Sequence, residues 1–375
     1  MNVERIIREY IRYHGAISVD QFMEFALFHP EYGYYITQNP IGTNGDFTTA
    51  PEVSQFFGEL MGVWLGFYWQ EIGSPVEVKL IEVGPGQGTL MSDLLRATRN
   101  IKGFHDAIEI YMVETSPSLT AVQKQKLSDA SVPIKWVKDV SKIPDGPSLI
   151  IANELFDALP IKQFVQTPEG FKERLISCGA TGFNYVHSDE PIKDELLKDI
   201  LSRRPYRDFE NDSIVELSSS SIDIMTKLSK RLRYEKGAGL IIDYGYDINN
   251  VAPKPKATLQ SVKEHQYSDV FDNIGESDLT AHVNFSLLAA VASELKIGAT
   301  PALSQGTFLK AMGIELRGQM VSDNNKLDTD QKRDILKGIH RVTDPSEMGK
   351  LFKVMSIYSP QLPMPTVFRE YFNDC

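Results

Sequence analysis

The amino-acid sequence predicts an α/β fold built on a parallel, doubly wound sheet of the Rossmann-like type. From residue 76 to about 160, short apolar runs typical of buried strands alternate with helical patterns. The first apolar run, residues 78–83, ends in a glycine-rich turn that leads directly into a helical pattern. A later strand pattern, residues 238–246, indicates that the sheet resumes after a polar stretch. These three observations predict the fold class.

The 375 residues, of which 42% are hydrophobic, suffice for one large elaborated domain or two smaller ones. Residues 162–178 alternate as in a hairpin, and residues 218–235 have a helical pattern that leads into the fifth core strand. The predicted division is a helical N-terminal region at 1–75 that packs on the core, a core at 76–178 and 213–315, an inserted cap or substrate region at 179–212, and a C-terminal helical region at 316–375.

The glycine turn at residues 84–88 reads Gly-Pro-Gly-Gln-Gly and predicts a nucleotide-type site, because the backbone can approach a ligand closely there. A dinucleotide fingerprint is Gly-x-Gly-x-x-Gly, whereas here the spacing is Gly-x-Gly-x-Gly. An acid, Glu82, lies two residues before the first glycine. A carboxylate there would repel a pyrophosphate but suits the ammonium of a methionine moiety. The pattern therefore favours S-adenosylmethionine as the cofactor.

The next strands also end in polar residues. The second apolar run, residues 108–113, is followed by Glu114, which lies 26 residues beyond the last glycine and suits a ribose-binding acid. A third run ends near Asp139, well placed to bracket an adenine, and a fourth ends at Asn153. The predicted cofactor-binding residues are Asp46, Thr48, Thr49, Glu82, Gly84, Pro85, Gly86, Gly88, Glu114, Asp139, Val140 and Asn153.

The loop at residues 45–52 has two open interpretations. Asp46, Thr48 and Thr49 could bind the amino-acid portion of the cofactor or close over the site. They could instead form a turn that introduces the next helix, with Pro51 in its first turn. We favour ligand contact.

Composition and charge indicate which partners and which cellular compartment suit this chain. The net charge of −11 argues against a nucleic-acid backbone as the main partner, since phosphate binding needs clustered lysine and arginine. The two cysteines, Cys178 and Cys375, form no disulfide framework or zinc spacing, which fits a reducing compartment. The most hydrophobic helix, residues 56–69, is too short for a bilayer, and the N-terminus lacks a signal or transit pattern. These features predict a cytoplasmic protein without membrane insertion.

With these segments assembled, the chain resembles the MidA-like family of S-adenosylmethionine-dependent methyltransferases over most of its length. The glycine motif is common to all class I methyltransferases. The segments Gly-Asp-Phe-Thr-Thr-Ala-Pro-Glu at 45–52 and Asn-Glu-Leu-Phe-Asp-Ala-Leu-Pro at 153–160 are far more specific. The matching stretches are 44–52 with 57–59, 82–88, 153–160, 243–246, 277–283 and 305–309.

This resemblance implies a seven-stranded class I methyltransferase fold with an elaborated cap. Eukaryotic members of the family are mitochondrial protein arginine methyltransferases that act on a complex I subunit. We therefore expect a protein substrate, with arginine of a respiratory-complex-type subunit as the leading acceptor, and we allow for a homodimer. Two alternatives stay open: a non-catalytic assembly factor that binds the cofactor and a protein partner, and a nicotinamide dehydrogenase.

Methyl transfer to arginine requires a guanidinium to be oriented and to lose a proton. Carboxylates are the best partners for its planar fork. Glu154 and Asp157 lie three residues apart after the fourth strand, and in a helical turn they would project from the same side. We predict that they are the catalytic pair, although Asp157 and Asn153 could instead cap a following helix.

The remaining candidates are aromatic, acidic and histidine residues near the expected pocket. His265, Asp278 and His282 invite a metal interpretation, but their separations match no compact ligand motif, so no metal site is predicted. The predicted substrate-binding residues are Tyr34, Asp243, Tyr244, His265 and His282.

Overall fold

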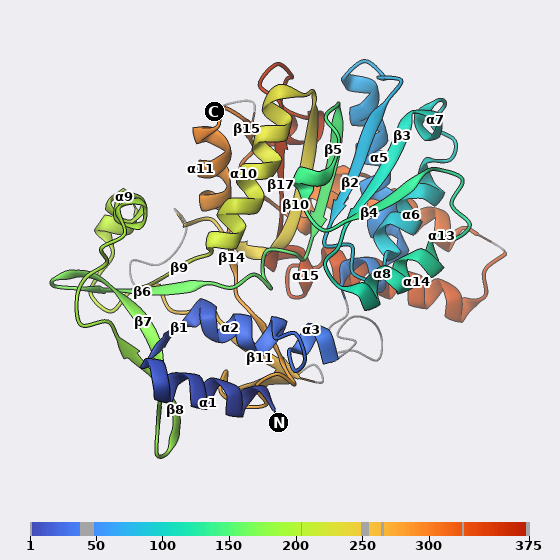
Figure 1. The fold of residues 1–375 in the computed structure, drawn as a ribbon. Helices are drawn as coiled ribbons and strands as arrows, with labels where there is room; N and C mark the ends of the chain where they lie inside the picture. Colours follow the sequence, from blue (N-terminus) through green and yellow to red (C-terminus); the bar gives the residue numbers. More distant parts are fainter. Residues whose placement is uncertain are drawn as a thin grey trace.

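A central sheet with helices on both faces and a smaller cap beside it make up the computed structural model (Figure 1). The structure describes residues 2–37, 49–203, 205–248, 255–263, 266–324 and 326–372. No helix in this described part of the chain has the length and apolar character needed to cross a bilayer.

The central sheet has the order β15-β17-β10-β5-β2-β3-β4, and β14 and β16 pair with β10 and β17. Strands β4, β3, β2, β5 and β10 run parallel, whereas β17 is antiparallel to β10. This arrangement confirms the predicted Rossmann-like class. The strands are β2 (Val78–Val83), β3 (Ile108–Val113), β4 (Ile134–Val137), β5 (Ser148–Asn153), β10 (Gly237–Tyr246), β14 (Val283–Asn284), β15 (Gly298–Ala299), β16 (Leu303–Ser304) and β17 (Phe352–Tyr358).

Successive strand residues face opposite sides of this sheet, so its near-continuous apolar strands are covered twice. Leu80 belongs to the cluster packed by α5 and α6, and Ile81 to the one packed by α10 and α11 (Figure 1). The first face carries α4 (Ala50–Val53), α5 (Gln55–Glu71), α6 (Thr89–Thr98), α7 (Phe104–Ala107), α12 (Gln305–Ala311), α13 (Ile314–Ser322), α14 (Thr329–Thr343), α15 (Met348–Leu351) and α16 (Thr366–Phe372). The second carries η1 (Val140–Lys142), α10 (Ser219–Tyr234) and α11 (Phe285–Glu294), while α8 (Pro117–Lys126) connects β3 to β4.

The cap contains two small antiparallel sheets and the N-terminal helices. One sheet has the order β1-β7-β6-β9, with β8 paired to β7, and the other has the order β12-β11-β13. Its elements are α1 (Val3–His14), β1 (Ile17–Ser18), α2 (Val19–Phe28), α3 (Tyr34–Thr37), β6 (Lys162–Thr167), β7 (Gly170–Gly179), β8 (Gly182–His187), α9 (Glu195–Ser202), η2 (Tyr206–Asp208), β9 (Ile214–Leu217), β11 (Gln260–Lys263), β12 (Gln266–Ser268) and β13 (Asp278–Thr280).

The structure divides the chain differently from the predicted regions. Within 1–75, α1 and α2 pack into the cap cluster through residues such as Ile7 and Phe22, and only α4 and α5 cover the core. The predicted hairpin at 162–178 forms, but it belongs to the cap sheet. The region 316–375 is not purely helical, because it contributes β17 to the central sheet.

Helix α5 approaches α6 closely through glycines spaced four residues apart, Gly58 and Gly62 among them. An added Cβ at Gly62 would lie 2.9 Å from Leu94 Cα, and one at Gly58 would lie 2.7 Å from Asp93 Cβ. Backbone cannot yield as a flexible side chain can, so the spacing of the two helices depends on these missing side chains.

We predict that Gly62→Ala destabilises the protein by about 1–3 kcal/mol, because overpacking outweighs the roughly 1 kcal/mol gain in helix propensity. Gly318→Ala in α13 is the matched control, since its added Cβ would meet its nearest neighbour at 3.5 Å. Urea unfolding of both variants checks this, and a stabilised Gly62→Ala would contradict it.

Candidate active site

Most of the predicted site residues gather around a cavity of about 810 Å³ at the carboxyl edge of the central sheet. The ends of β2, β3, β4 and β5 form one side, and Tyr35 and Asp278 of the cap contribute to the other. A smaller cavity of about 40 Å³ shares part of this lining. The predicted residues that line one or both are Thr49, Glu82, Gly84, Pro85, Gly86, Glu114, Asp139, Val140, Asn153, Glu154 and Asp157.

The glycine turn exposes bare backbone to both cavities. Gly84 and Gly86 have φ values of 70° and 53°, in the left-handed region that favours glycine. A Cβ on Gly84 would lie 2.8 Å from Leu155 Cδ1. Gly88 has φ 78° and is the N-cap residue of α6, so it shapes the turn and is absent from the lining of both cavities.

Glu114 is held by a short hydrogen-bond network at the end of β3. Its Oε1 accepts the Ser116 N–H at 2.7 Å, and its Oε2 accepts from Gln123 Nε2 at 3.1 Å. The same Gln123 nitrogen donates to the Gly86 carbonyl at 2.8 Å, and Trp136 Nε1 donates to Gln123 Oε1 at 2.9 Å. Burial raises the pKa of Glu114. Gln123 thus ties the predicted ribose acid to the glycine turn.

Sequence reasoning missed Gln123. It is fully buried in α8, yet glutamine is an ordinary helix residue and no motif marks this position.

Glu82 is an unusually placed acid beneath the glycine turn. It is 3% exposed, and its Oε2 has no hydrogen-bond partner among the described residues. Burial raises its pKa to about 8. Since Glu82 lines the smaller cavity, its carboxylate is available to a cationic group of a ligand there.

Glu154 and Asp157 both line the larger cavity, although the helical turn expected for them is absent and a bend and turn follow β5. Glu154 has φ 51°, and its Oε1 accepts the Ala50 N–H at 2.8 Å and Asn153 Nδ2 at 3.3 Å. Loss of solvation on burial raises the pKa of Glu154 to about 8 and also raises the pKa of Asp157. The Asn153 side chain therefore serves Glu154, and no helix follows for it to cap.

Asp243 has a different position from the one predicted. Its fully buried carboxylate accepts the backbone N–H groups of Phe156 at 2.9 Å, Asp157 at 3.3 Å and Tyr244 at 2.9 Å. These bonds fix the turn that carries Asp157, and Asp243 does not line either cavity described above. The geometry favours a positioning role for Asp243 over substrate contact.

Three other predicted substrate residues do not line either cavity. Tyr34 is fully buried in the cap core, and its neighbour Tyr35 lines the larger cavity instead, donating from its hydroxyl to Asp278 at 3.1 Å. Tyr244 and His282 pack edge to face with ring centroids 5.4 Å apart. His265, Asp46 and Thr48 lie outside the described residues.

Asp139 and Val140 form the end of the cavity beyond β4. Asp139 Oδ2 lies 2.6 Å from Lys227 Nζ, and this ion pair lowers the pKa of Asp139 to about 2. Its Oδ1 accepts the Ser141 N–H at 2.8 Å. Val140 and Val113 add apolar surface beside Asp139, which suits the flat ring of an adenine.

The donor set fits S-adenosylmethionine. Bare backbone at Gly84 and Gly86, an oriented acid at Glu114 and an apolar wall at Val140 suit a nucleoside. Glu82 is buried and its Oε2 has no hydrogen-bond partner among the described residues, so it suits the ammonium group of the methionine moiety.

Comparison with known proteins decides the family. A family model described as "Putative S-adenosyl-L-methionine-dependent methyltransferase" matches residues 60–300. The chain belongs to this family. It is similar to "Protein arginine methyltransferase NDUFAF7, mitochondrial" of Danio rerio, with 34% identity over 92% of this chain and 83% of the relative. The Homo sapiens protein of that name is 31% identical, over 92% of this chain and 81% of its own.

A solved structure supports the same fold. A Burkholderia thailandensis protein described as a "likely methyl transferase", crystallised with S-adenosyl-homocysteine, has a TM-score of 0.84 and 23% identity. The match covers 98% of this chain and 94% of that one. This likeness confirms the fold, whereas the family membership shows that the chain is an S-adenosylmethionine-dependent methyltransferase with S-adenosylmethionine as its cofactor, as predicted.

The predicted cytoplasmic location is wrong. The relatives from zebrafish and human are both named as mitochondrial proteins. The prediction relied on composition and unpaired cysteines, and neither property distinguishes one reducing compartment from another.

We predict that Gln123→Leu weakens binding of S-adenosylhomocysteine about tenfold or more, because Glu114 and the Gly86 carbonyl lose a shared donor. Gln125→Leu, at an exposed position of the same helix, is the control. Isothermal titration measures both affinities, and equal values would show that the network does not position the cofactor.

We predict that Glu82→Gln stabilises the free protein while weakening cofactor binding. Because the folded-state pKa of about 8 lies above the ordinary value of 4.5, the wild type loses stability as the pH rises between these values. The gain from Glu82→Gln, on the order of 1–3 kcal/mol near neutral pH, should therefore be larger at pH 8 than at pH 5. Thermal unfolding at both pH values tests this, with the exposed Glu77→Gln as control.

Proposed function

We propose that this methyltransferase acts on an arginine side chain of a protein. The observation that carries the proposal is the pair Glu154 and Asp157, two carboxylates in the cofactor cavity. Among the described residues, no lysine or arginine forms an ion pair with either one. Two carboxylates in one low-dielectric cavity favour a cationic ligand, and a guanidinium can bridge them with its fork of donors.

The chemistry needs little beyond positioning. Bound S-adenosylmethionine supplies an electrophilic methyl group. Glu154, fixed by the Ala50 N–H, is placed to orient the acceptor nitrogen and to take the proton released on methylation. Asp157 completes the clamp, and Asp243 holds Asp157 in place through its backbone N–H. Tyr35 and Asp278 belong to the opposite, cap side of the cavity and help to exclude water.

The relatives support the same acceptor class, since they are named as protein arginine methyltransferases of mitochondria. We propose an arginine of a respiratory complex I subunit as the acceptor and a mitochondrial place of action. We also propose that two copies of the chain form a homodimer. Measurement of the molecular mass in solution tests this.

Methyl transfer tests the proposed acceptor directly. Purified protein is incubated with tritium-labelled S-adenosylmethionine and complex I subunits, and mass spectrometry locates the methyl group. We expect it on arginine, with transfer abolished by Gly86→Val, which blocks the cofactor, and reduced at least a hundredfold by Glu154→Gln, which spares it. Methylation of lysine or of small molecules alone, with cofactor binding intact, would contradict the proposal.

The same assay has a predicted pH dependence. Burial is the main cause of the raised pKa of Glu154; the charge of Asp157 raises this pKa further and Arg341 lowers it, and Asp243 also interacts with Glu154. Because Glu154 must be ionised to bind the guanidinium and accept its proton, kcat/KM should rise with pH through about 8. Glu154→Gln should remove this inflection, and the exposed Glu31→Gln should keep it.

A further inference from the structure

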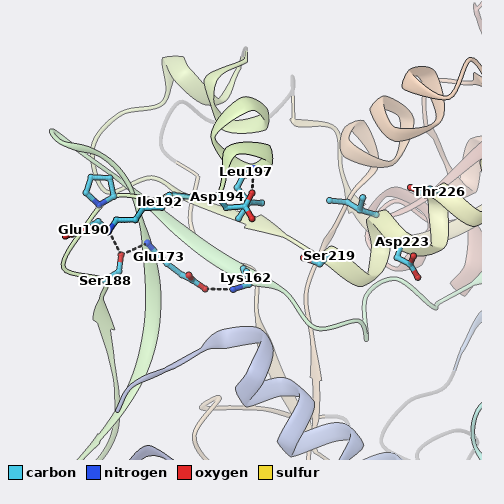
Figure 2. A pocket seen from close by; sticks show the side chains of 13 residues that line it. Lys162, Glu173, Ser188, Glu190, Ile192, Asp194, Leu197, Ser219, Asp223 and Thr226 are labelled. Carbon is cyan, nitrogen blue, oxygen red and sulfur yellow. Dashed lines mark hydrogen bonds and ion pairs between the residues drawn. The ribbon is translucent and has the colours of Figure 1, made fainter. Parts of the chain in front are cut away.

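A second cavity of about 640 Å³ lies between the cap and helix α10 (Figure 2). One wall comes from β6, β7 and the segment at 188–197 that leads into α9. The facing wall is the first turns of α10, with Ser219, Asp223 and Thr226 (Figure 2). We call this cavity the cap groove.

The cap groove adjoins the cofactor cavity at the start of α10. Ser219 and Asp223 line both of them. A chain segment lying in the groove would therefore reach, past the start of α10, the cavity that contains Glu154 and Asp157. None of the cofactor-binding groups discussed above lines the groove itself.

The groove carries a surplus of negative charge. Its lining has four acids, Glu173, Glu190, Asp194 and Asp223, and two lysines. Both lysines are already paired within the groove, since Lys162 Nζ lies 2.8 Å from Glu173 and Lys193 pairs with Glu190. Asp223 is paired as well, since its Oδ2 lies 2.8 Å from Lys227 Nζ of the cofactor cavity, and Asp194 has no ion pair among the described residues. The lining as a whole keeps more acids than lysines, and this excess of negative charge attracts cations.

Apolar side chains lie between these charges. Ile192, Leu197 and Ile222 line the groove and pack against a second apolar cluster of the cap, which contains Phe164. An occupant that suits both features alternates basic with apolar side chains. Nucleic acid and other polyanions do not match this surface, because they would meet its net negative charge.

We propose that the cap groove binds the polypeptide segment that flanks the methylated arginine, and that this segment is basic with interspersed apolar residues. The inference rests on the proposed function, because it assumes a protein acceptor. It adds a docking surface outside the reaction cavity that selects the acceptor by charge. The arginine itself enters the cofactor cavity past Ser219 and Asp223.

The test uses full-length protein and defined peptides. The probe is a fluorescein-labelled 12-residue peptide with one central arginine flanked by lysines and leucines, and its counterpart has glutamates for the lysines. The groove variant is Glu190→Lys with Asp194→Asn. Asn keeps the N-cap of α9, where Asp194 accepts the Leu197 N–H at 3.0 Å. The control, Glu315→Lys with Asp323→Asn, changes charge equally on α13, far from α9 in Figure 1.

We expect the wild type to bind the basic peptide at least tenfold more tightly than the acidic one at low salt, by fluorescence anisotropy. The groove variant should lose about tenfold in affinity and in kcat/KM for the basic peptide, whereas the control should change less than twofold. S-adenosylhomocysteine affinity and methylation of Nα-acetyl-arginine methylamide, which is too short to reach the groove, should stay the same in both variants.

Equal binding of the basic peptide by groove and control variants would overturn the docking proposal, as would preference for the acidic peptide. A photoreactive benzoylphenylalanine in the peptide gives a second measurement. Crosslinks to residues 188–197 or 219–226 support the groove, and crosslinks confined to other surfaces overturn it. Failure of the proposed function is separate: the wild type would then methylate no arginine acceptor, while the anisotropy still reports on docking.

Discussion

The parallel pairing of β2 with β5 is the constraint on which the rest of the site depends. The register brings Val83 opposite Ala152, so the two strands end at the same height in the sheet. From there one chain turns through the glycines into α6, and the other turns at Glu154. The order of the sheet reverses at this point, which opens a crevice beyond the strand ends. Glu82, Gly84 and Glu154 lie around that crevice.

This crevice concentrates carboxylates in surroundings that disfavour their charge. Glu82 lies under the glycine turn, and Glu154 and Asp157 lie past β5, each with a pKa raised by burial. Acids in such positions are costly to folding unless they meet a cation. Two separate groups of them match the two cations of the proposed reaction, the ammonium of the methyl donor and the guanidinium of the acceptor. Stability and activity therefore make opposite demands on the same side chains.

Much of the cofactor half could be predicted from sequence because its signals are local. A strand, a glycine turn and an acid at the end of the next strand follow one another in the chain, and their spacing reflects one crossover helix. The sequence predicts Glu82, Gly84, Gly86 and Glu114 in this way, and each of them lines at least one of the two cavities.

The acceptor half depends on contacts between distant segments, and there the predictions failed in specific ways. Sequence could not distinguish Tyr34 from Tyr35, because the choice depends on how α3 sits against Asp278. The sequence predicts Asp243 as a pocket acid, but two of its three backbone partners are N–H groups 86 and 87 residues away. Strand β17 went unrecognised because its partner in the sheet, β10, precedes it by more than a hundred residues.

The late position of β17 in the sequence also affects how the central sheet folds during synthesis. Strand β10 pairs with β5 on one side and, through residues 238–244, with β17 on the other. During synthesis every parallel strand leaves the ribosome before residues 352–358 do. The nascent sheet therefore has an apolar open edge along β10 until residues 352–358 emerge and pair with it, and an exposed edge of this kind is a template for aggregation.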